Sequence, residues 1–131
     1  MVLAQVVIVS AVSIFFTILF LQSGLDKIID WKGNVEFHSG HFANSPLKNI
    51  APAMLVMITF LELCCGISSL GGLIWLLIKG DPQISFYACC LAALNFLALF
   101  FGQRISKDYK GAATLVPYFI VSLIGMFVTS V

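Results

Sequence analysis

The stretch "ISFYACCLAALNFLALFFGQ", residues 84–103, contains no charged side chain. A hydrocarbon core about 30 Å thick is crossed by about 20 predominantly apolar residues in a helix, so this stretch can span a membrane once. The whole chain of 131 residues is 60% hydrophobic and 10% charged, whereas about a quarter of a soluble domain is charged. The composition therefore predicts an integral membrane protein.

Three further stretches have the same character. Residues 1–25 and 111–131 carry no charge, and Glu62 is the only charged residue within 49–78. We therefore predict one domain, residues 1–131, with an all-α polytopic fold in which four antiparallel helices form a transmembrane bundle. The predicted spans lie near residues 2–24, 51–78, 84–103 and 112–131.

The first loop, residues 26–49, is the only sizeable connection between these spans. Trp31 is expected to anchor the loop at the membrane interface. Lys32-Gly33-Asn34 then supplies a helix breaker and an N-cap candidate. Apolar and polar residues alternate after it, which predicts a short interfacial helix on the membrane surface, and Ser45-Pro46 is expected to end that helix.

Both histidines of the chain lie in this loop. His38 and His41 are three residues apart and can share a helix face, with Glu36 to one side. The pattern is not H-E-x-x-H and offers no third strong ligand, so we predict no metal site. We interpret Trp31, Glu36, His38 and His41 as candidates for a docking surface or lid over the bundle.

The distribution of basic residues predicts the orientation. Six of the seven Lys and Arg residues lie in the first and third loops. Loops rich in Lys and Arg favour the cytoplasmic side, so we expect these two loops in the cytoplasm and both termini outside. The net charge of +1 provides no basic patch for nucleic acid, and the expected partner is the lipid bilayer.

Two pairs of cysteines, Cys64-Cys65 and Cys89-Cys90, could suggest a thiol site. Adjacent residues on a helix point about 100° apart, so neither pair can chelate as C-x-x-C does. The first pair should lie roughly 20 Å below the second loop and the other roughly 8 Å, too far apart for disulfides, which need Cα atoms within about 7 Å. We expect them instead in small-residue faces that let helices approach closely. The two faces are Cys65, Ser68, Ser69 and Gly72, and Ser85, Cys89, Ala92 and Ala93.

Glu62 should lie about 18 Å along the second span, near the middle of the bilayer. An ionised carboxylate there costs at least about 2.5–3.5 kcal/mol, so it must face a partner inside the bundle or stay protonated. Asn95 and Tyr118 have a similar expected depth, and Gln22 and Ser23 lie nearer the interface. The alternatives are a structural hydrogen-bond clamp between helices and a site that handles a ligand, a quinone or protons.

Lys27 lies near the end of the first span, between two acids of the first loop. Its spacing from Asp30 allows an i, i+3 pair. It can alternatively turn inward toward the bundle. The sequence leaves both possibilities open.

Three segments resemble the DoxX-like family of small four-helix membrane proteins: "FLQSGLDKIIDW" (20–31), "LELCCGISSLGGL" (61–73) and "GAATLVPYFIVSL" (111–123). The resemblance covers nearly the whole chain. It implies a bacterial inner (cytoplasmic) membrane location and redox-associated complexes, such as those of thiosulfate:quinone oxidoreductase subunits. It also singles out Lys27 and Glu62.

Our preferred functional hypothesis is an accessory or structural subunit of a membrane complex, with other membrane subunits or further copies of itself as partners. The alternative is a quinone-linked oxidoreductase subunit of the thiosulfate:quinone type. Its pocket would lie inside the bundle around Glu62, Asn95, Tyr118 and Lys27. The chain has no haem-ligand pattern and no dinucleotide motif, so no cofactor is expected except a quinone held in that pocket or through a partner.

Overall fold

The structure, a computed structural model, describes residues 1–131 and is built from helices. Their bounds are α1 Leu3–Ile29, α2 Trp31–His41, the short 3-10 helix η1 Lys48–Ile50, α3 Ala51–Lys79, α4 Gln83–Ile105 and α5 Tyr109–Ser130. Four of them, α1, α3 with η1, α4 and α5, are long and apolar enough to cross a membrane. The predicted all-α polytopic bundle is confirmed.

The ends of the spanning helices follow from local sequence. Hydrocarbon offers no hydrogen bonds to the backbone, so apolar segments must satisfy their own peptide groups as helices. α3 ends where Gly80 takes the left-handed conformation, at φ 69°, and its amide donates to the Leu76 carbonyl. α5 begins where the Asp108 side chain accepts a hydrogen bond from the Gly111 amide.

The boundary between α1 and α2 differs from the prediction. α1 continues to Ile29, past the charged residues that marked its predicted end, and Lys27 there contacts Ser23 of the same helix and Glu62 of α3. A short helix in the first loop is confirmed, but it begins at Trp31, and its N-cap is Asp30 rather than Asn34. It ends at His41, before Ser45-Pro46, because Phe42 turns into the core, where it is 4% exposed.

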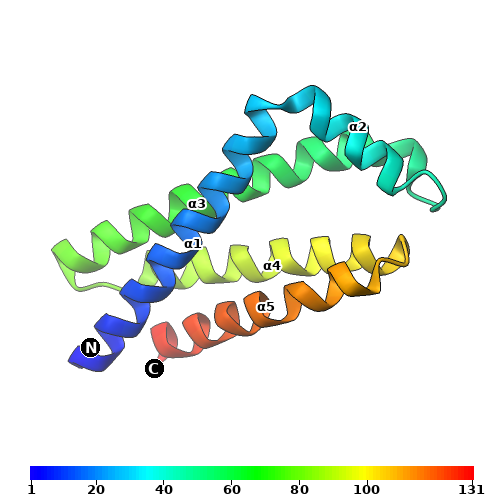
Figure 1. Ribbon diagram of the computed structural model, residues 1–131. Helices are drawn as coiled ribbons and strands as arrows, with labels where there is room; N and C mark the ends of the chain where they lie inside the picture. Colours follow the sequence, from blue (N-terminus) through cyan, green and yellow to red (C-terminus); the bar gives the residue numbers. More distant parts are fainter.

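Neighbouring spans run antiparallel. Gly24 and Leu21 of α1 lie against Leu63 and Gly66 of α3, respectively, and α4 packs between α3 and α5. Both termini lie at one end of the bundle (Figure 1), where the Gln5 side chain reaches the Val131 carbonyl. The first and third loops therefore share the opposite end.

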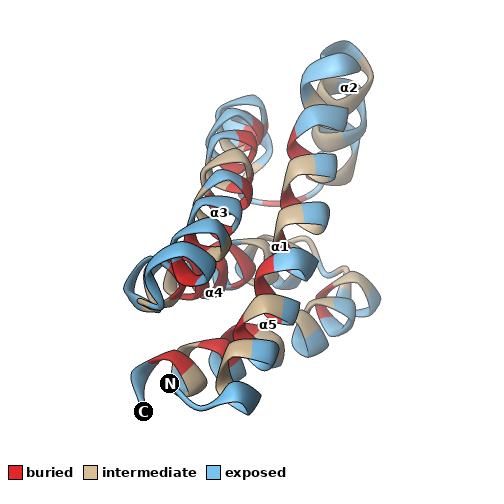
Figure 2. Ribbon diagram, turned by 90° about the vertical axis from the view of Figure 1, so that its left-hand side faces the viewer, coloured by how far each residue is buried: buried red, intermediate tan, exposed pale blue.

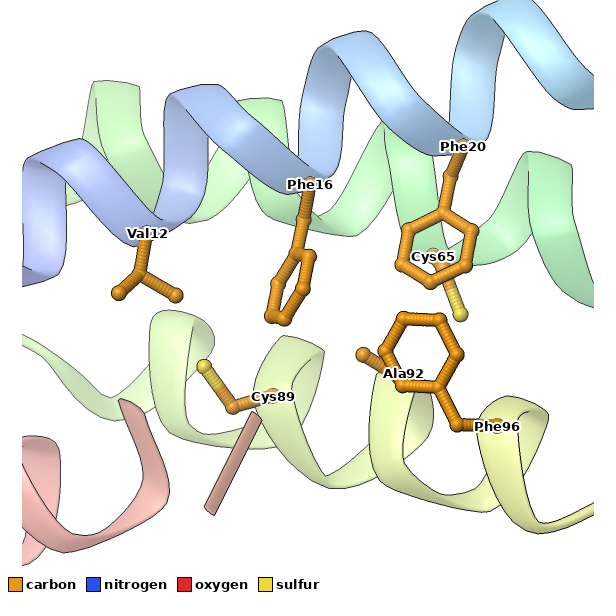
Figure 3. Packing of buried hydrophobic residues seen from close by; sticks show 7 residues of the cluster. All are labelled: Val12, Phe16, Phe20, Cys65, Cys89, Ala92 and Phe96. Carbon is orange, nitrogen blue, oxygen red and sulfur yellow. The ribbon is translucent and has the colours of Figure 1, made fainter. Parts of the chain in front are cut away.

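The core lies where α1, α3 and α4 meet. Figure 3 shows two phenylalanines of α1, Phe16 and Phe20, pointing toward Phe96 of α4. Cys65 and Cys89 pack in the same cluster as buried free thiols, which confirms their expected packing role. Figure 2 shows the buried residues on the inner faces and the exposed residues turned outward, as expected for helices in contact with lipid.

α1 does not accompany α3 along its whole length. In Figure 1, α1 crosses α3 at an angle, and after the end of α1 the chain turns back as α2 over the first part of α3. The first part of α3 therefore has α2 beside it, and Met54, Met57 and Ile58 of α3 share a cleft with residues of α2. The position of the short polar helix α2 against α3 shapes the candidate site.

Candidate functional site

A buried ion pair lies where α1 crosses α3. The Lys27 ammonium is 2.9 Å from a carboxylate oxygen of Glu62, and their side chains are 18% and 4% exposed. The same ammonium lies 2.8 Å from the Ser23 hydroxyl and 3.4 Å from the Ser23 carbonyl. Glu62 therefore has a cationic partner, and Lys27 has turned inward rather than pairing with Asp30.

Two glycines allow this contact. A Cβ atom on Gly24 would lie 2.7 Å from a side-chain carbon of Leu63, and one on Gly66 would lie 2.7 Å from a side-chain carbon of Leu21. Small residues let helix backbones approach closely in lipid. The Gly-x-x-Lys of α1 and the Glu-x-x-x-Gly of α3 are thus the two halves of one helix crossing.

The other predicted partners of Glu62 have different neighbours. Asn95 is fully buried, and its amide nitrogen lies 3.8 Å from the Cys65 sulfur. The ring of Tyr118 stacks on Phe96 with centroids 5.8 Å apart. Neither residue hydrogen-bonds to Glu62, so the structure joins Lys27 to Glu62 but leaves Asn95 and Tyr118 outside that contact.

A cleft of about 350 Å³ lies between α2, the first part of α3 and the last part of α4. Ten of its fifteen lining residues are hydrophobic, so its walls suit an apolar molecule. Polar groups enter it from α2, from the last turn of α4 and from the connection between α4 and α5; they are His38, His41, Gln103 and Asp108. None of Glu62, Asn95, Tyr118 and Lys27 lines this cleft. A smaller groove of about 170 Å³ between α4 and α5 is wholly apolar.

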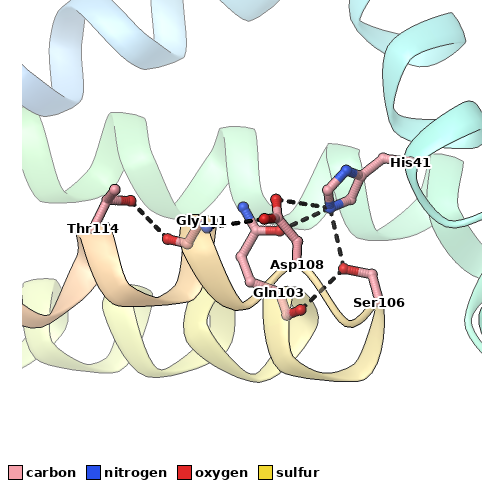
Figure 4. Close-up of polar contacts among 6 residues, drawn as sticks. All are labelled: His41, Gln103, Ser106, Asp108, Gly111 and Thr114. Carbon is pink, nitrogen blue, oxygen red and sulfur yellow. Dashed lines mark hydrogen bonds and ion pairs between the residues drawn. The ribbon is translucent and has the colours of Figure 1, made fainter.

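His41 ties α2 to the α4–α5 connection (Figure 4). Its Nε2 lies 2.7 Å from the Gln103 side-chain oxygen, 3.1 Å from the Ser106 hydroxyl and 3.8 Å from a carboxylate oxygen of Asp108. The Ser106 hydroxyl donates to the Gln103 carbonyl, so toward His41 its oxygen accepts. All three neighbours are then acceptors, and Nε2 carries the proton.

His38 lies half-buried one turn before His41. Burial is the largest cause of its lowered pKa, followed by the charges of His41 and Lys27. The imidazole is therefore neutral near pH 7 and offers one donor and one acceptor. Its ring makes no hydrogen bond within the chain and lies 5.2 Å from the Phe42 ring, centroid to centroid.

The docking candidates of the first loop divide into two pairs. His38 and His41 line the cleft, whereas Trp31 and Glu36 are exposed and do not. Sequence reasoning missed Gln103, which lies in the last turn of α4, next to the third connection. The available signal was the charge distribution, because it places the first and third loops on the same side of the membrane.

Local backbone geometry fixes the polar edge of the cleft. Lys107 adopts a positive φ of 63°, which turns the chain between α4 and α5. Asp108 then caps α5, with one carboxylate oxygen 2.9 Å from the Gly111 amide. A Cβ on Gly111 would lie 2.5 Å from Asp108 Oδ2 and 3.0 Å from the Gln103 amide nitrogen, so a side chain here would displace the two polar groups of the cleft edge.

Comparisons with protein families, curated proteins and solved structures find no significant match. The chain's integral membrane character rests on its four apolar spans. Its candidate site rests on the cleft and on the His41 contacts at the cleft edge. The resemblance to DoxX-like proteins stays a prediction.

Proposed function

We propose that this chain is a small subunit of a membrane complex that holds a lipophilic, hydrogen-bonding molecule in the cleft beneath α2. The observation that carries the proposal is the composition of the cleft, which combines apolar walls with four polar residues. Small-molecule sites have this character, with few polar groups that fix the orientation of the ligand, in volumes from about 300 Å³.

The walls suit a molecule that is dissolved in the bilayer. Phe37, Met57 and Phe101 line the cleft and are each more than half exposed. In a membrane such surfaces contact lipid or a lipophilic ligand. α2 acts as the lid over this ligand, and His41 is the polar contact that holds the lid to the α4–α5 connection.

Quinones are the ligand class that we favour, because the resemblance to DoxX-like proteins implies redox-associated complexes. A quinone joins an apolar ring and tail to carbonyl acceptors, and the cleft offers donors at Gln103 and His38. This chain supplies binding, orientation and shielding from water, and a partner subunit supplies the electron-transfer chemistry. The Lys and Arg residues of the first and third loops favour a cytoplasmic position for the cleft, and the resemblance supports a bacterial inner membrane.

Lys27 and Glu62 have a structural role in this proposal. Each charge already has its partner, and glycine contacts close the crossing around them. The pair holds α1 against α3 in the last turn of α1. It therefore positions α2, and with it the cleft.

The ligand can be tested by chemical identification. The protein is purified in mild detergent from its native membranes, and the extracted lipophilic molecules are identified by mass spectrometry. Ala98→Phe should fill the cleft, because Ala98 lines it, and should remove the bound molecule. The matched control is Ala113→Phe on the outward face of α5, which should retain it. Equal yields from both variants would contradict a ligand in the cleft.

The subunit role needs a separate test. Affinity purification under several mild detergent conditions should recover a constant partner protein. Recovery of the chain alone under every condition would count against membership of a complex, without bearing on the cleft.

A further inference from the structure

The polar edge of the cleft carries one residue with a full charge, and that charge is negative. Asp108 is the only acidic residue that lines the cleft, and no Lys or Arg lines it. Basic residues are nearby in sequence, but the Arg104 guanidinium lies over the Tyr109 ring, 4.5 Å from its centroid. Lys48, Lys107 and Lys110 are exposed, where salt screens their charge.

The Asp108 carboxylate is held in place by two contacts. One oxygen accepts the hydrogen bond from the Gly111 amide, at 2.9 Å, and the other lies 3.8 Å from His41 Nε2. The first contact is at the N-terminus of α5, where the helix dipole stabilises a negative charge. A fixed negative charge thus lies beside the apolar walls.

The free hydrogen-bonding groups at the same edge are uncharged. The Gln103 side-chain oxygen accepts from His41, and the Gln103 amide nitrogen makes no hydrogen bond within the chain. His38 also makes none, and the lowered pKa of its imidazole keeps it uncharged near pH 7. These groups can bind a carbonyl or hydroxyl, but they provide no cation for an anionic head.

We propose that the cleft selects lipophilic molecules with a neutral, hydrogen-bonding head and rejects anionic amphiphiles, with Asp108 as the residue that sets this specificity. The inference rests on the proposed ligand cleft and names the head-group class of its occupant. An anionic head in the cleft would lose hydration and would face the Asp108 carboxylate, a charge of the same sign, at the edge of the cleft. A ketone or hydroxyl head loses less hydration and meets the Gln103 amide.

Photoaffinity labelling tests this specificity. The full-length protein in phosphatidylcholine nanodiscs at pH 8 is exposed to diazirine probes that share one alkyl tail and carry a ketone, a sulfonate or a quaternary ammonium head. Labelled peptides are quantified by mass spectrometry. Ketone labelling of cleft peptides should exceed sulfonate labelling by about tenfold, the ratio that corresponds to about 1.4 kcal/mol.

Asp108→Asn should bring the ketone and sulfonate labelling close to equal. Asparagine caps a helix about as well as aspartate, so the variant removes the charge and keeps the start of α5. The matched control is Asp81→Asn at the opposite end of the bundle, where Asp81 accepts from the Gln83 amide. This control should keep the wild-type ratio.

Several outcomes would overturn the inference: equal labelling of the wild type by ketone and sulfonate, an unchanged ratio in Asp108→Asn, or preferred labelling by the ammonium probe. Ala98→Phe separates these results from failure of the ligand cleft itself. If Ala98→Phe abolishes ketone labelling and the head groups are not distinguished, only the head-group inference is wrong. If Ala98→Phe changes labelling by no probe, the cleft is not the binding site.

Discussion

The Lys27–Glu62 contact and the His41 contacts at the cleft edge both join polar residues of distant helices, but they differ in how completely they are closed. Lys27 has oxygen partners from Ser23 and Glu62, and the Glu62 side chain is 4% exposed. At the cleft edge, the Asp108 side chain is 36% exposed, and the Gln103 amide nitrogen has no partner in the chain. A closed contact serves packing, whereas one with unused donors beside an apolar cavity can serve binding.

The two regions are also connected. α1 contacts α3 through the ion pair in its last turn, and α2 then turns back over the first part of α3. The cleft lies beneath that cover. The position of the Lys27–Glu62 contact therefore determines where the His41 contacts at the cleft edge can form.

Breaking the ion pair should have the largest effect. Lys27→Ala leaves the Glu62 carboxylate buried without its cation, which should lower the free energy of unfolding by about 3–5 kcal/mol. The measurement is reversible denaturation in mixed detergent micelles. Lys27→Met combined with Glu62→Leu should recover most of this loss, because removing both charges leaves neither unpaired. A loss of stability in the double variant equal to the sum of the losses in its two single variants would contradict a direct pair.

Widening the helix crossing should have the next largest effect. Gly66→Ala places a methyl group against Leu21, with backbone 3.0 Å away, and overpacking of this kind costs about 1–3 kcal/mol. The matched control is Gly71→Ala on the same helix, where a Cβ would have no neighbour within 4 Å. That variant should be neutral or stabilised by up to about 1 kcal/mol, since alanine favours helix over glycine. Similar stabilities of the two variants would show that α1 and α3 are not in close contact here.

The fold was predictable because it depends on where charges are absent. Four charge-free lengths of chain require helices in a bilayer, whatever their packing. It was also predictable that Glu62 needs a partner, because it is the only charged residue in its apolar span. The identity of the partner was not, because a depth estimate treats each helix as upright, and α1 crosses α3 at an angle that its glycines allow.

The cleft was partly predictable. A lid formed by the first loop, with His38 and His41 on it, followed from the polar residues of that loop. The presence of Gln103 and Asp108 in the cleft could not be predicted, because it depends on how α2 lies against the α4–α5 connection. That placement depends on contacts such as the burial of Phe42, which no residue pattern within one helix reports.

Loosening the lid should cost less than breaking the ion pair. His41→Ala removes hydrogen bonds at a half-buried site, worth about 0.5–1.5 kcal/mol. Hydrogen exchange should speed up in α2 and at the start of α5 and stay unchanged across the α1–α3 crossing. Glu36→Ala, on the exposed side of α2, is the control and should leave exchange unchanged. Equal exchange in wild type and His41→Ala would show that His41 does not hold α2.

The smallest expected effect is a pH dependence that joins the two regions. The folded-state pKa of His38 is lowered by burial, then by His41 and Lys27, so the unfolded chain, with a histidine pKa of about 6.5, binds more protons between the two values. Stability should rise with pH through this window and be fully present above about 6.5. Thermal denaturation of the wild type at pH 7.5 and pH 5.5 should show a lower melting temperature at pH 5.5.

His38→Gln removes this titration and should make the melting temperature less sensitive to pH over that range. An unchanged sensitivity in the variant would contradict a lowered pKa. The variant that combines Lys27→Met with Glu62→Leu should reduce the sensitivity only in part. Burial, the largest cause of the lowered His38 pKa, remains in that variant, while the charge of Lys27 is gone.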